Sequence, residues 1–352
     1  MCKVTLAIPI YNVERYVERS LLSALNQSFE DIEFLIVDDK GTDNSMKIVK
    51  DIQLTHPRGE SIRVVDHVVN KGIGATRNTS IEYAQGKYLY FMDSDDVIEP
   101  DTIRVLYDIM EKEHADVVES SYQICSVDGY VFEKHILPSI KVVGHYAICD
   151  WMNRSRTYYD GYVWNKLYDL SFLRSNNISC TDIHKNEDVL FSFQVVLKAK
   201  SIVTVPFVSY NYVMRSDSTV HQKVDISCYN QYIDIFNKRT LLMKSVHEKN
   251  IPLSLYNYYL QHFFEWWLPY ILFGDFSVEE KVLFYKKIQK IYELDFTIKD
   301  LIGLRYKILY KLIKKENYKY ITYFYKIDSW VAKCYNKVNS HFHITKLPYS
   351  HL

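Results

Sequence analysis

The strongest constraint on the fold is an alternation in the first half of the chain, where short runs of β-branched and other apolar residues alternate with segments of helical periodicity. This alternation is typical of β-α units, in which helices connect parallel strands of one sheet. The strands are expected at residues 4–8, 32–37, 62–65 and 88–92. The sequence therefore predicts an α/β fold with a mainly parallel central sheet.

Between these strands, apolar residues spaced by three and four positions predict helices. Asn12 is expected to cap the first helix, and Asp43 or Asn44 the second. The third and fourth helices are expected at 76–84 and 101–112.

The pattern changes along the rest of the chain. Further strands and one helix are expected up to residue 214, with a hairpin turn at Asp128-Gly129: strands at 117–125, 130–135, 163–168 and 202–214, and a helix at 188–199. From about residue 225 the periodicity becomes helical, with aromatic and basic residues interleaved. We therefore expect two domains, residues 1–224 and 225–352, the second a helical, aromatic- and Lys-rich C-terminal extension.

The composition is that of a folded protein of a reducing compartment. The 352 residues are 48% hydrophobic and 24% charged, and the six cysteines are scattered, which argues against disorder, a disulfide framework and a zinc site. The N-terminus lacks the pattern of a signal peptide, and the apolar run at 266–273 is far below the roughly 18 residues that span a bilayer. We expect a cytoplasmic protein, and no feature indicates a nucleic-acid partner.

The charges are unevenly distributed, because residues 281–352 carry 15 Lys and Arg against 5 Asp and Glu although the net charge is zero. A helical pattern through Leu301, Leu304 and Ile308 is surrounded by basic residues and followed by tyrosines. Such a helix suits an anionic membrane surface, so one hypothesis places the protein peripherally on the inner face of the membrane. Packing against the first domain, or contact between copies, explains the pattern equally well.

Polar residues follow the expected strands. In an open α/β sheet, ligands bind beyond the carboxyl ends of the strands, so these residues are candidates for a site. Four segments qualify: Pro9-Ile10-Tyr11-Asn12, Asp38-Asp39, Asn70-Lys71-Gly72 with Arg77-Asn78, and Asp93-Ser94-Asp95-Asp96. The last concentrates three carboxylates, which suits Mg²⁺ or Mn²⁺ held by one or two protein ligands and by substrate phosphates. Alternatively, Asp95 or Asp96 caps the following helix.

In order and spacing, these segments resemble the family 2 glycosyltransferases with the GT-A fold, especially those of bacterial surface polysaccharide assembly. The resemblance covers residues 4 to about 219 and also includes Trp164-Asn165-Lys166-Leu167-Tyr168 and Asn186-Glu187-Asp188. It implies transfer of a hexose from a nucleotide-diphosphate donor, of the UDP-sugar type, to a glycan or lipid-linked glycan acceptor. The sequence departs from the family at Lys40-Gly41 and at Ser80, which concerns loop shape rather than reacting groups.

The resemblance implies a role for each candidate residue. The donor would contact Pro9, Tyr11, Asp39, Lys71, Arg77, Asp93, Asp96 and Arg215. Among these, Tyr11 would lie against the base, and Asp39 would accept a hydrogen bond from a ring nitrogen of the base. Asp95 would be the direct metal ligand, Asp93 would reach the ribose or the outer shell of the metal, and His221 is a further candidate ligand.

The resemblance also implies the catalytic base. Asp188 would withdraw the proton of the acceptor hydroxyl, with Glu187 supporting the loop or the acceptor. A single base with no nucleophilic partner gives inversion at the anomeric carbon. The alternative for this pair is two acids that complement the positive end of a helix.

Alternatives exist for the other residues and for the function. Asp39 is otherwise a turn residue, Arg77 an exposed helical arginine, and His221 a surface histidine. A sugar nucleotidyltransferase would also have a parallel sheet and an acidic metal site, but a Gly-rich phosphate loop is expected there. The remaining alternative is a non-catalytic protein that binds nucleotide sugar or serves as a scaffold.

Overall fold

The computed structural model describes residues 2–149, 151, 161–181, 187–215 and 226–245, with isolated residues beyond them. The chain forms two compact units, Met1–Arg239 and Thr240–Leu352. The features below belong to the first unit, and the division at 224/225 that the sequence suggested stays a prediction. Helix α8 (Ile226–Ser245) begins just after this predicted division.

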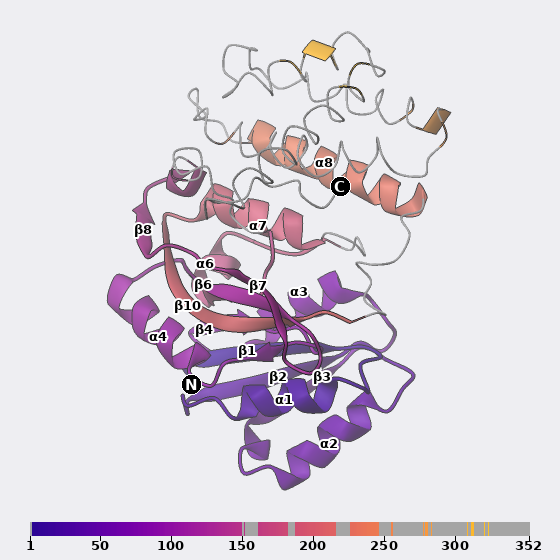
Figure 1. Cartoon of the computed structure of the whole chain (residues 1–352), viewed down its shortest axis with the longest axis vertical. Helices are drawn as coiled ribbons and strands as arrows, with labels where there is room; N and C mark the ends of the chain where they lie inside the picture. Colours follow the sequence, from indigo (N-terminus) through magenta and orange to yellow (C-terminus); the bar gives the residue numbers. More distant parts are fainter. Residues whose placement is uncertain are drawn as a thin grey trace. The chain divides into compact units, whose positions relative to one another are not determined.

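The four strands expected in the first half of the chain are present and lie side by side. β1 (Val4–Ile10) pairs with β2 (Ile32–Asp38) and with β4 (Tyr88–Phe91), and β2 pairs with β3 (Ile62–Asp66). All three pairings are parallel. The carboxyl ends of these strands therefore meet at one edge of the sheet (Figure 1).

The other half of the sheet mixes the two directions. β6 pairs in parallel with β10, whereas β9 lies between β4 and β6 and is antiparallel to both. The strand order is β3-β2-β1-β4-β9-β6-β10-β5, with β7 on β6 and β8 on β10. The bounds are Val97–Ile98 for β5, Val117–Cys125 for β6, Val131–His135 for β7, Ile140–Val143 for β8, Lys166–Asp169 for β9 and Ser201–Val213 for β10. The predicted α/β fold is confirmed, with a mixed sheet whose N-terminal half is parallel.

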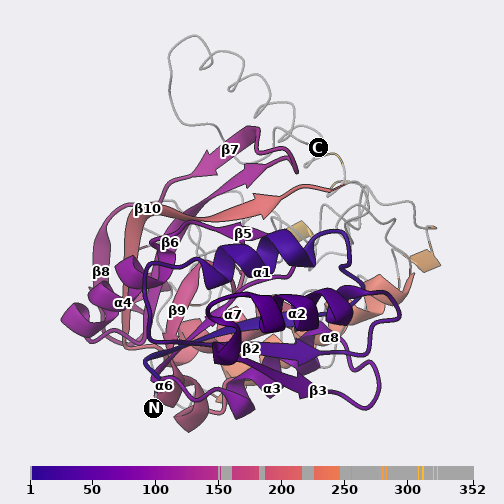
Figure 2. The same cartoon turned by 90° about the horizontal axis from the view of Figure 1, so that it is seen from below.

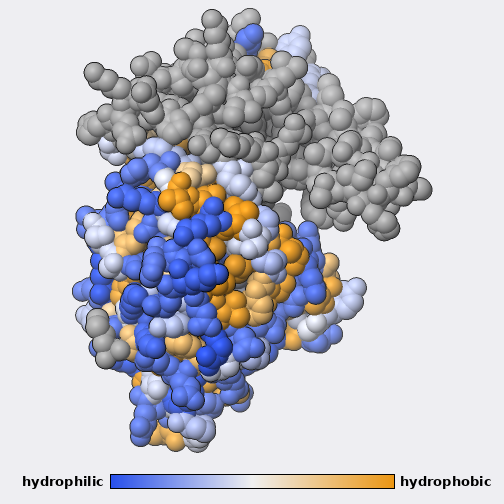
Figure 3. All heavy atoms as spheres, turned by 90° about the vertical axis from the view of Figure 1, so that its left-hand side faces the viewer, coloured by the Kyte–Doolittle hydropathy of each residue, from blue (hydrophilic) through white to orange (hydrophobic). Residues whose placement is uncertain are grey.

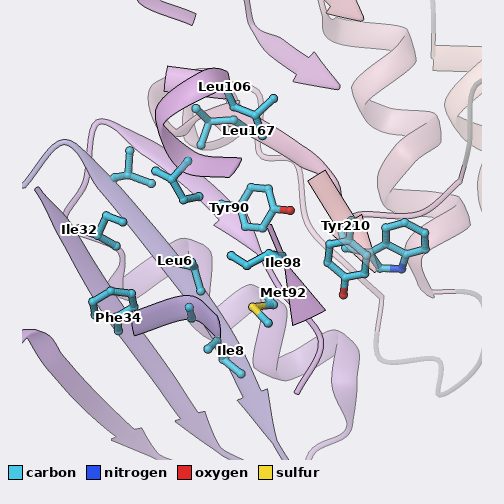
Figure 4. Packing of buried hydrophobic residues seen from close by; sticks show 14 of the residues in the cluster. Leu6, Ile8, Ile32, Phe34, Tyr90, Met92, Ile98, Leu106, Leu167 and Tyr210 are labelled. Atoms are coloured by element: carbon cyan, nitrogen blue, oxygen red, sulfur yellow. The ribbon is translucent and has the colours of Figure 1, made fainter. Parts of the chain in front are cut away.

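Helices cover both faces of the sheet, which explains why the first strands are apolar without alternation. On one face, the core joins strand residues such as Leu6, Ile8 and Phe34 to Leu106 of α4 (Figure 4). On the other face, the Phe91 ring lies 5.9 Å from that of Phe191 on α7. The helices are α1 (Val17–Leu25), α2 (Ser45–Thr55), α3 (Ile73–Tyr83), α4 (Thr102–Glu113), α6 (Leu170–Ser175) and α7 (Glu187–Lys198), with a short 3-10 helix at Gly59–Ser61 (Figures 1 and 2).

The predicted N-cap of the first helix is wrong. α1 begins at Val17, because the chain first forms a turn in which the N–H of Val17 bonds to the Val13 carbonyl. Asn12 has a positive φ of 50°, and its Oδ1 accepts the N–H of Thr42 at 2.7 Å. Its side chain therefore joins the loops that follow β1 and β2 instead of capping a helix.

The predicted hairpin at Asp128-Gly129 is confirmed, since β6 and β7 pair antiparallel and Gly129 has a φ of 86°. β7 is an edge strand whose residues are half-buried or exposed, including Phe132 at 56% exposure. Hydrophobic side chains also gather on the surface at the left of Figure 1, among hydrophilic neighbours (Figure 3). Within the described residues, no helix combines the length and apolarity needed to cross a bilayer.

Candidate active site

The site begins where β1 and β2 end. Pro9 is buried inside β1, while the Tyr11 side chain beyond it is 48% exposed. The Asp39 N–H donates to the Ile10 carbonyl at 3.0 Å, so the two chain segments leave the sheet together. An exposed aromatic ring and a carboxylate thus follow neighbouring strands.

Asp39 holds the turn that precedes α3. Its carboxylate is buried and accepts the N–H groups of Lys71 and Gly72, each at 2.8 Å. His67 Nδ1 lies 2.7 Å from the same carboxylate. Gly72 has a φ of 84°, which a residue with a side chain rarely adopts. The Lys71 side chain is left exposed at this turn.

Arg77 joins the end of β4 to the beginning of α7. It lies on α3 with 4% exposure, and its Nη2 is 2.9 Å from Asp93 Oδ1. Its Nη1 forms a second ion pair with Glu187 Oε1. Burial alone would lower the pKa of the guanidinium, but Asp93 and Glu187 raise it. The two acidic segments, which are far apart in the sequence, therefore share one buried cation.

Cys180 and Thr181, which precede α7 in the chain, pack closely against α3. A Cβ on Gly74 would lie 2.1 Å from the Thr181 carbonyl oxygen, so only glycine permits the approach. The Asn78 side chain bonds both the N–H and the carbonyl of Cys180, at 2.7 and 2.9 Å. These contacts place the chain that leads to α7 against the first turns of α3.

The two acids at the start of α7 differ in their surroundings. Glu187 is buried, and burial raises its pKa to about 7, opposed by Arg77 and reinforced by Asp188 and Asp93. Asp188 is half-buried, and its Oδ1 accepts the N–H of Val189 at 2.8 Å. Burial also raises the pKa of Asp188, with Arg77 opposing the shift. Three carboxylates around one guanidinium leave an excess of negative charge.

Asp96 belongs to the framework of the turn after β4. It is buried, and its two oxygens accept the Tyr210 hydroxyl at 2.8 Å and the Val213 N–H at 2.7 Å. The same hydroxyl accepts the N–H of Asp93 at 3.1 Å, and Figure 4 shows Tyr210 beside Met92. Burial, then Asp95 and Asp93, raise the pKa of Asp96 well above its usual range.

Asp95 forms an ion pair with Arg215, whose guanidinium also lies 4.9 Å from the Tyr16 ring centre. Burial and the neighbouring Asp93 raise the pKa of Asp95, and Arg215 opposes the shift. The Asp95 carbonyl accepts Arg19 Nη2 at 3.2 Å. Asp95 therefore occupies a place where positive charge is stabilising.

A divalent cation fits this donor set in a limited way. Asp93 and Asp95 offer hard carboxylate oxygens, and Mg²⁺ or Mn²⁺ uses one or two such ligands together with substrate phosphates. Among the described residues, no three His, Cys, Asp or Glu side chains form a group that could hold a metal by themselves. His221 and Asn186 lie outside the described residues. A cation here would therefore depend on the substrate for most of its ligands.

The structure thus brings most of the predicted residues together, although the role of each stays a prediction. Direct contacts connect Asp93, Arg77 and Glu187, with Asp188 beside them, and Asp95 pairs with Arg215. Sequence reasoning missed His67 and Tyr210. His67 follows β3 directly, where a polar residue could have been noticed, whereas Tyr210 was indistinguishable from a core residue of its strand.

The sequence pattern described as glycosyl transferase family 2 matches residues 5–173, which include β1 to β4 and the carboxylates that follow them. Over this span, which is just under half of its length, the chain matches this family. Among curated relatives, the poly(ribitol-phosphate) beta-glucosyltransferase of Bacillus spizizenii is 29% identical over 223 residues, which are 61% of this chain and 33% of that protein. The chain spans between 33% and 63% of the length of the first curated relatives that it matches.

Solved structures share the fold of this chain. The S. aureus TarS fragment in complex with UDP-GlcNAc has a TM-score of 0.76 at 19% identity, covering 93% of this chain and 92% of that one. The mannosyltransferase PcManGT of Pyrobaculum calidifontis, in complex with GDP-Man and Mn²⁺, has a TM-score of 0.53 at 13% identity, with 84% and 76% covered. The likeness to TarS confirms the GT-A fold.

Proposed function

We propose that the protein is an inverting glycosyltransferase that moves a hexose from a nucleotide-diphosphate donor, a UDP-sugar, to a hydroxyl of an acceptor glycan. The observation that carries the proposal is the double ion pair of Arg77. It brings the acidic end of β4, suited to a cation and a diphosphate, to the acidic start of α7, suited to a base. A protein that only binds nucleotide sugar would need the carboxylates at the end of β4 but would not need a base at the start of α7.

The proposed site for the nucleobase of the donor lies at the turns after β1 and β2. The exposed Tyr11 ring offers a stacking surface for a nucleobase, and Asp39 offers a carboxylate acceptor beside it. The TarS fragment of similar fold binds UDP-GlcNAc. We therefore expect a uracil base here, because uracil has a ring N–H that a carboxylate can accept.

The diphosphate would lie beside Asp93 and Asp95, which would hold the divalent cation. When bound, that cation would stabilise the negative charge that develops on the departing diphosphate. Arg215 lies at Asp95 and would supply a second positive charge near the phosphates. The arginine would then exchange part of its contact with Asp95 for a phosphate oxygen.

Asp188 would act as the base. Its carboxylate is half-buried at the first turn of α7 and does not share the direct ion pair that Arg77 makes with Glu187. In the transfer, the acceptor O–H bond breaks and its proton goes to Asp188. The oxygen forms a bond to the anomeric carbon while the bond from that carbon to the diphosphate oxygen breaks. A single displacement of this kind inverts the anomeric configuration.

The acceptor is proposed by chemical class, as a glycan of a surface polymer, free or linked to lipid. A relative in the family is a poly(ribitol-phosphate) beta-glucosyltransferase, which supports a polymer acceptor. The proposal that the C-terminal region docks on an anionic membrane surface concerns residues outside those described, apart from isolated positions.

The test is a donor screen that measures release of UDP, GDP or dTDP with and without Mn²⁺, combined with Asp188→Asn. We expect metal-dependent UDP release that Asp188→Asn reduces by about a hundredfold or more, because proton withdrawal contributes roughly 10²- to 10⁴-fold. Glu82→Gln, at an exposed position of α3, is the matched control. A wild-type rate in Asp188→Asn would refute the base, and no response to any nucleotide would refute the function.

A further inference from the structure

One backbone and two side-chain hydrogen bonds hold His67 behind Asp39. Its backbone N–H donates to the Asp38 carbonyl at 2.9 Å, continuing the pairing of β2 and β3. Its Nδ1 lies 2.7 Å from Asp39 Oδ1, and its Nε2 lies 2.8 Å from Thr79 Oγ1 on α3. The ring is 4% exposed, so its orientation is set by these bonds and by the surrounding side chains.

The hydrogen bonds determine which atom of Asp39 is left to bind anything else. Oδ1 accepts the Lys71 N–H and the His67 ring, which occupies both of its lone pairs. Oδ2 accepts only the Gly72 N–H among the described residues, so one lone pair remains. The side chain is 3% exposed, so most of its surface is already covered by the protein.

The same contacts fix the proton on the imidazole. A carboxylate oxygen only accepts hydrogen bonds, so Nδ1 must carry the hydrogen. Nε2 of a neutral ring then accepts the Thr79 hydroxyl, and every polar atom of the ring has a partner. Thr79, His67 and Asp39 thus form a chain of hydrogen bonds in which each group donates to the next and the carboxylate is the final acceptor.

We propose that His67 is a positioning residue for donor selection, which turns the Asp39 carboxylate so that its one open lone pair on Oδ2 meets the nucleobase. This inference rests on the proposed function and adds a residue that does not touch the donor. Without the His67 bond, the N–H groups of Lys71 and Gly72 still hold the two oxygens, but the second lone pair of Oδ1 is left open. The carboxylate then offers two open acceptors, and the donor no longer meets a single one.

The selectivity follows from the acceptor-only character of that lone pair. A base that presents a ring N–H at this position, as uracil does, gains a hydrogen bond to a charged group. Cytosine presents a bare ring nitrogen at the same position, so two acceptors would face each other. The Asp39–His67 pair therefore favours uridine over cytidine nucleotides.

The test compares two amides at position 67 of the full chain. The amide nitrogen of Asn occupies the place of Nδ1 and can still bond to Asp39. The longer Gln places its nitrogen at Nε2, where it meets Thr79 and not Asp39. The measurement is the dissociation constant for UDP and for CDP by titration calorimetry with Mn²⁺, with the melting temperature of each variant recorded without nucleotide.

We expect His67→Asn to bind UDP within about threefold of wild type and His67→Gln to bind about tenfold more weakly, which corresponds to about 1.4 kcal/mol. The preference for UDP over CDP should shrink in the Gln variant alone. Equal UDP binding by wild type and the Gln variant, or an equal loss in both variants, would overturn the proposal.

Two further results keep the failure modes apart. If His67→Gln does not fold, Thr79→Val takes its place, because it removes only the hydroxyl that orients the ring. Weaker UDP binding at an unchanged melting temperature is expected there, and unchanged binding overturns the positioning role. If the wild-type protein itself binds no nucleotide, the proposed function fails and this inference fails with it.

Discussion

Replacing Glu187 by Gln should change how the stability of the protein depends on pH. The Glu187 carboxyl is 8% exposed and shares the Arg77 guanidinium with Asp93, while Asp188 lies beside it. Burial raises the pKa of Glu187 from 4.5 to about 7, because the opposing effect of Arg77 is smaller and Asp188 and Asp93 add to the rise. Gln keeps the shape and an amide oxygen for Arg77 but cannot ionise.

The direction and size of the effect follow from proton linkage. A carboxyl whose pKa is higher in the folded state stabilises the fold below its unfolded pKa, and this contribution is lost as pH rises through the folded pKa. For Glu187 the window runs from 4.5 to about 7. At about 1.4 kcal/mol per tenfold change in proton affinity, the loss is at most about 3 kcal/mol. The Glu187→Gln variant has no carboxyl to ionise at this position, so it does not lose this stability as the pH rises.

The assay is urea unfolding of the wild type and of Glu187→Gln at about pH 5 and about pH 8. These two pH values enclose most of the range over which Glu187 ionises. The free energy of unfolding of Glu187→Gln, minus that of the wild type, should be more positive at the higher pH by up to about 3 kcal/mol. Glu82→Gln, at an exposed site of α3, should show no such change. A difference that is the same at both pH values would refute the argument, because Glu187 would then be ionised throughout.

Two further predictions concern buried cations. Lys166 is fully buried and its Nζ lies 2.9 Å from the equally buried Glu119; Lys166→Met should therefore cost about 3 to 5 kcal/mol in urea unfolding. Adding Glu119→Gln should recover much of that loss, and a double variant as unstable as the single one would contradict the reasoning. Arg77→Lys should lower kcat about tenfold or more at saturating donor, because one ammonium group cannot bind two carboxylates in the geometry of the planar guanidinium. Wild-type turnover in that variant would show that the fork geometry is not needed.

The sequence by itself determined the fold class. β1, β2 and β4 are buried on both faces, so they appear as unbroken apolar runs, and the polar residues that follow them mark one edge of the sheet. The hairpin at Asp128-Gly129 was equally readable, because the positive φ that it needs favours glycine. The short β5, β8 and α6 were missed, since a few residues are too short to show a period.

Only the tertiary structure decided how the candidate residues are used. Asn12 has the right type for a helix cap, yet its Oδ1 accepts the Thr42 N–H, because α1 begins only at Val17 and the loop after β2 lies within hydrogen-bond reach. Arg77 has the periodicity of an ordinary helical residue, and its burial between Asp93 and Glu187 depends on a partner, Glu187, that lies 110 residues further along the chain. Sequence patterns report local preference, whereas these partners are chosen by the packing of distant elements, and no local rule encodes that choice.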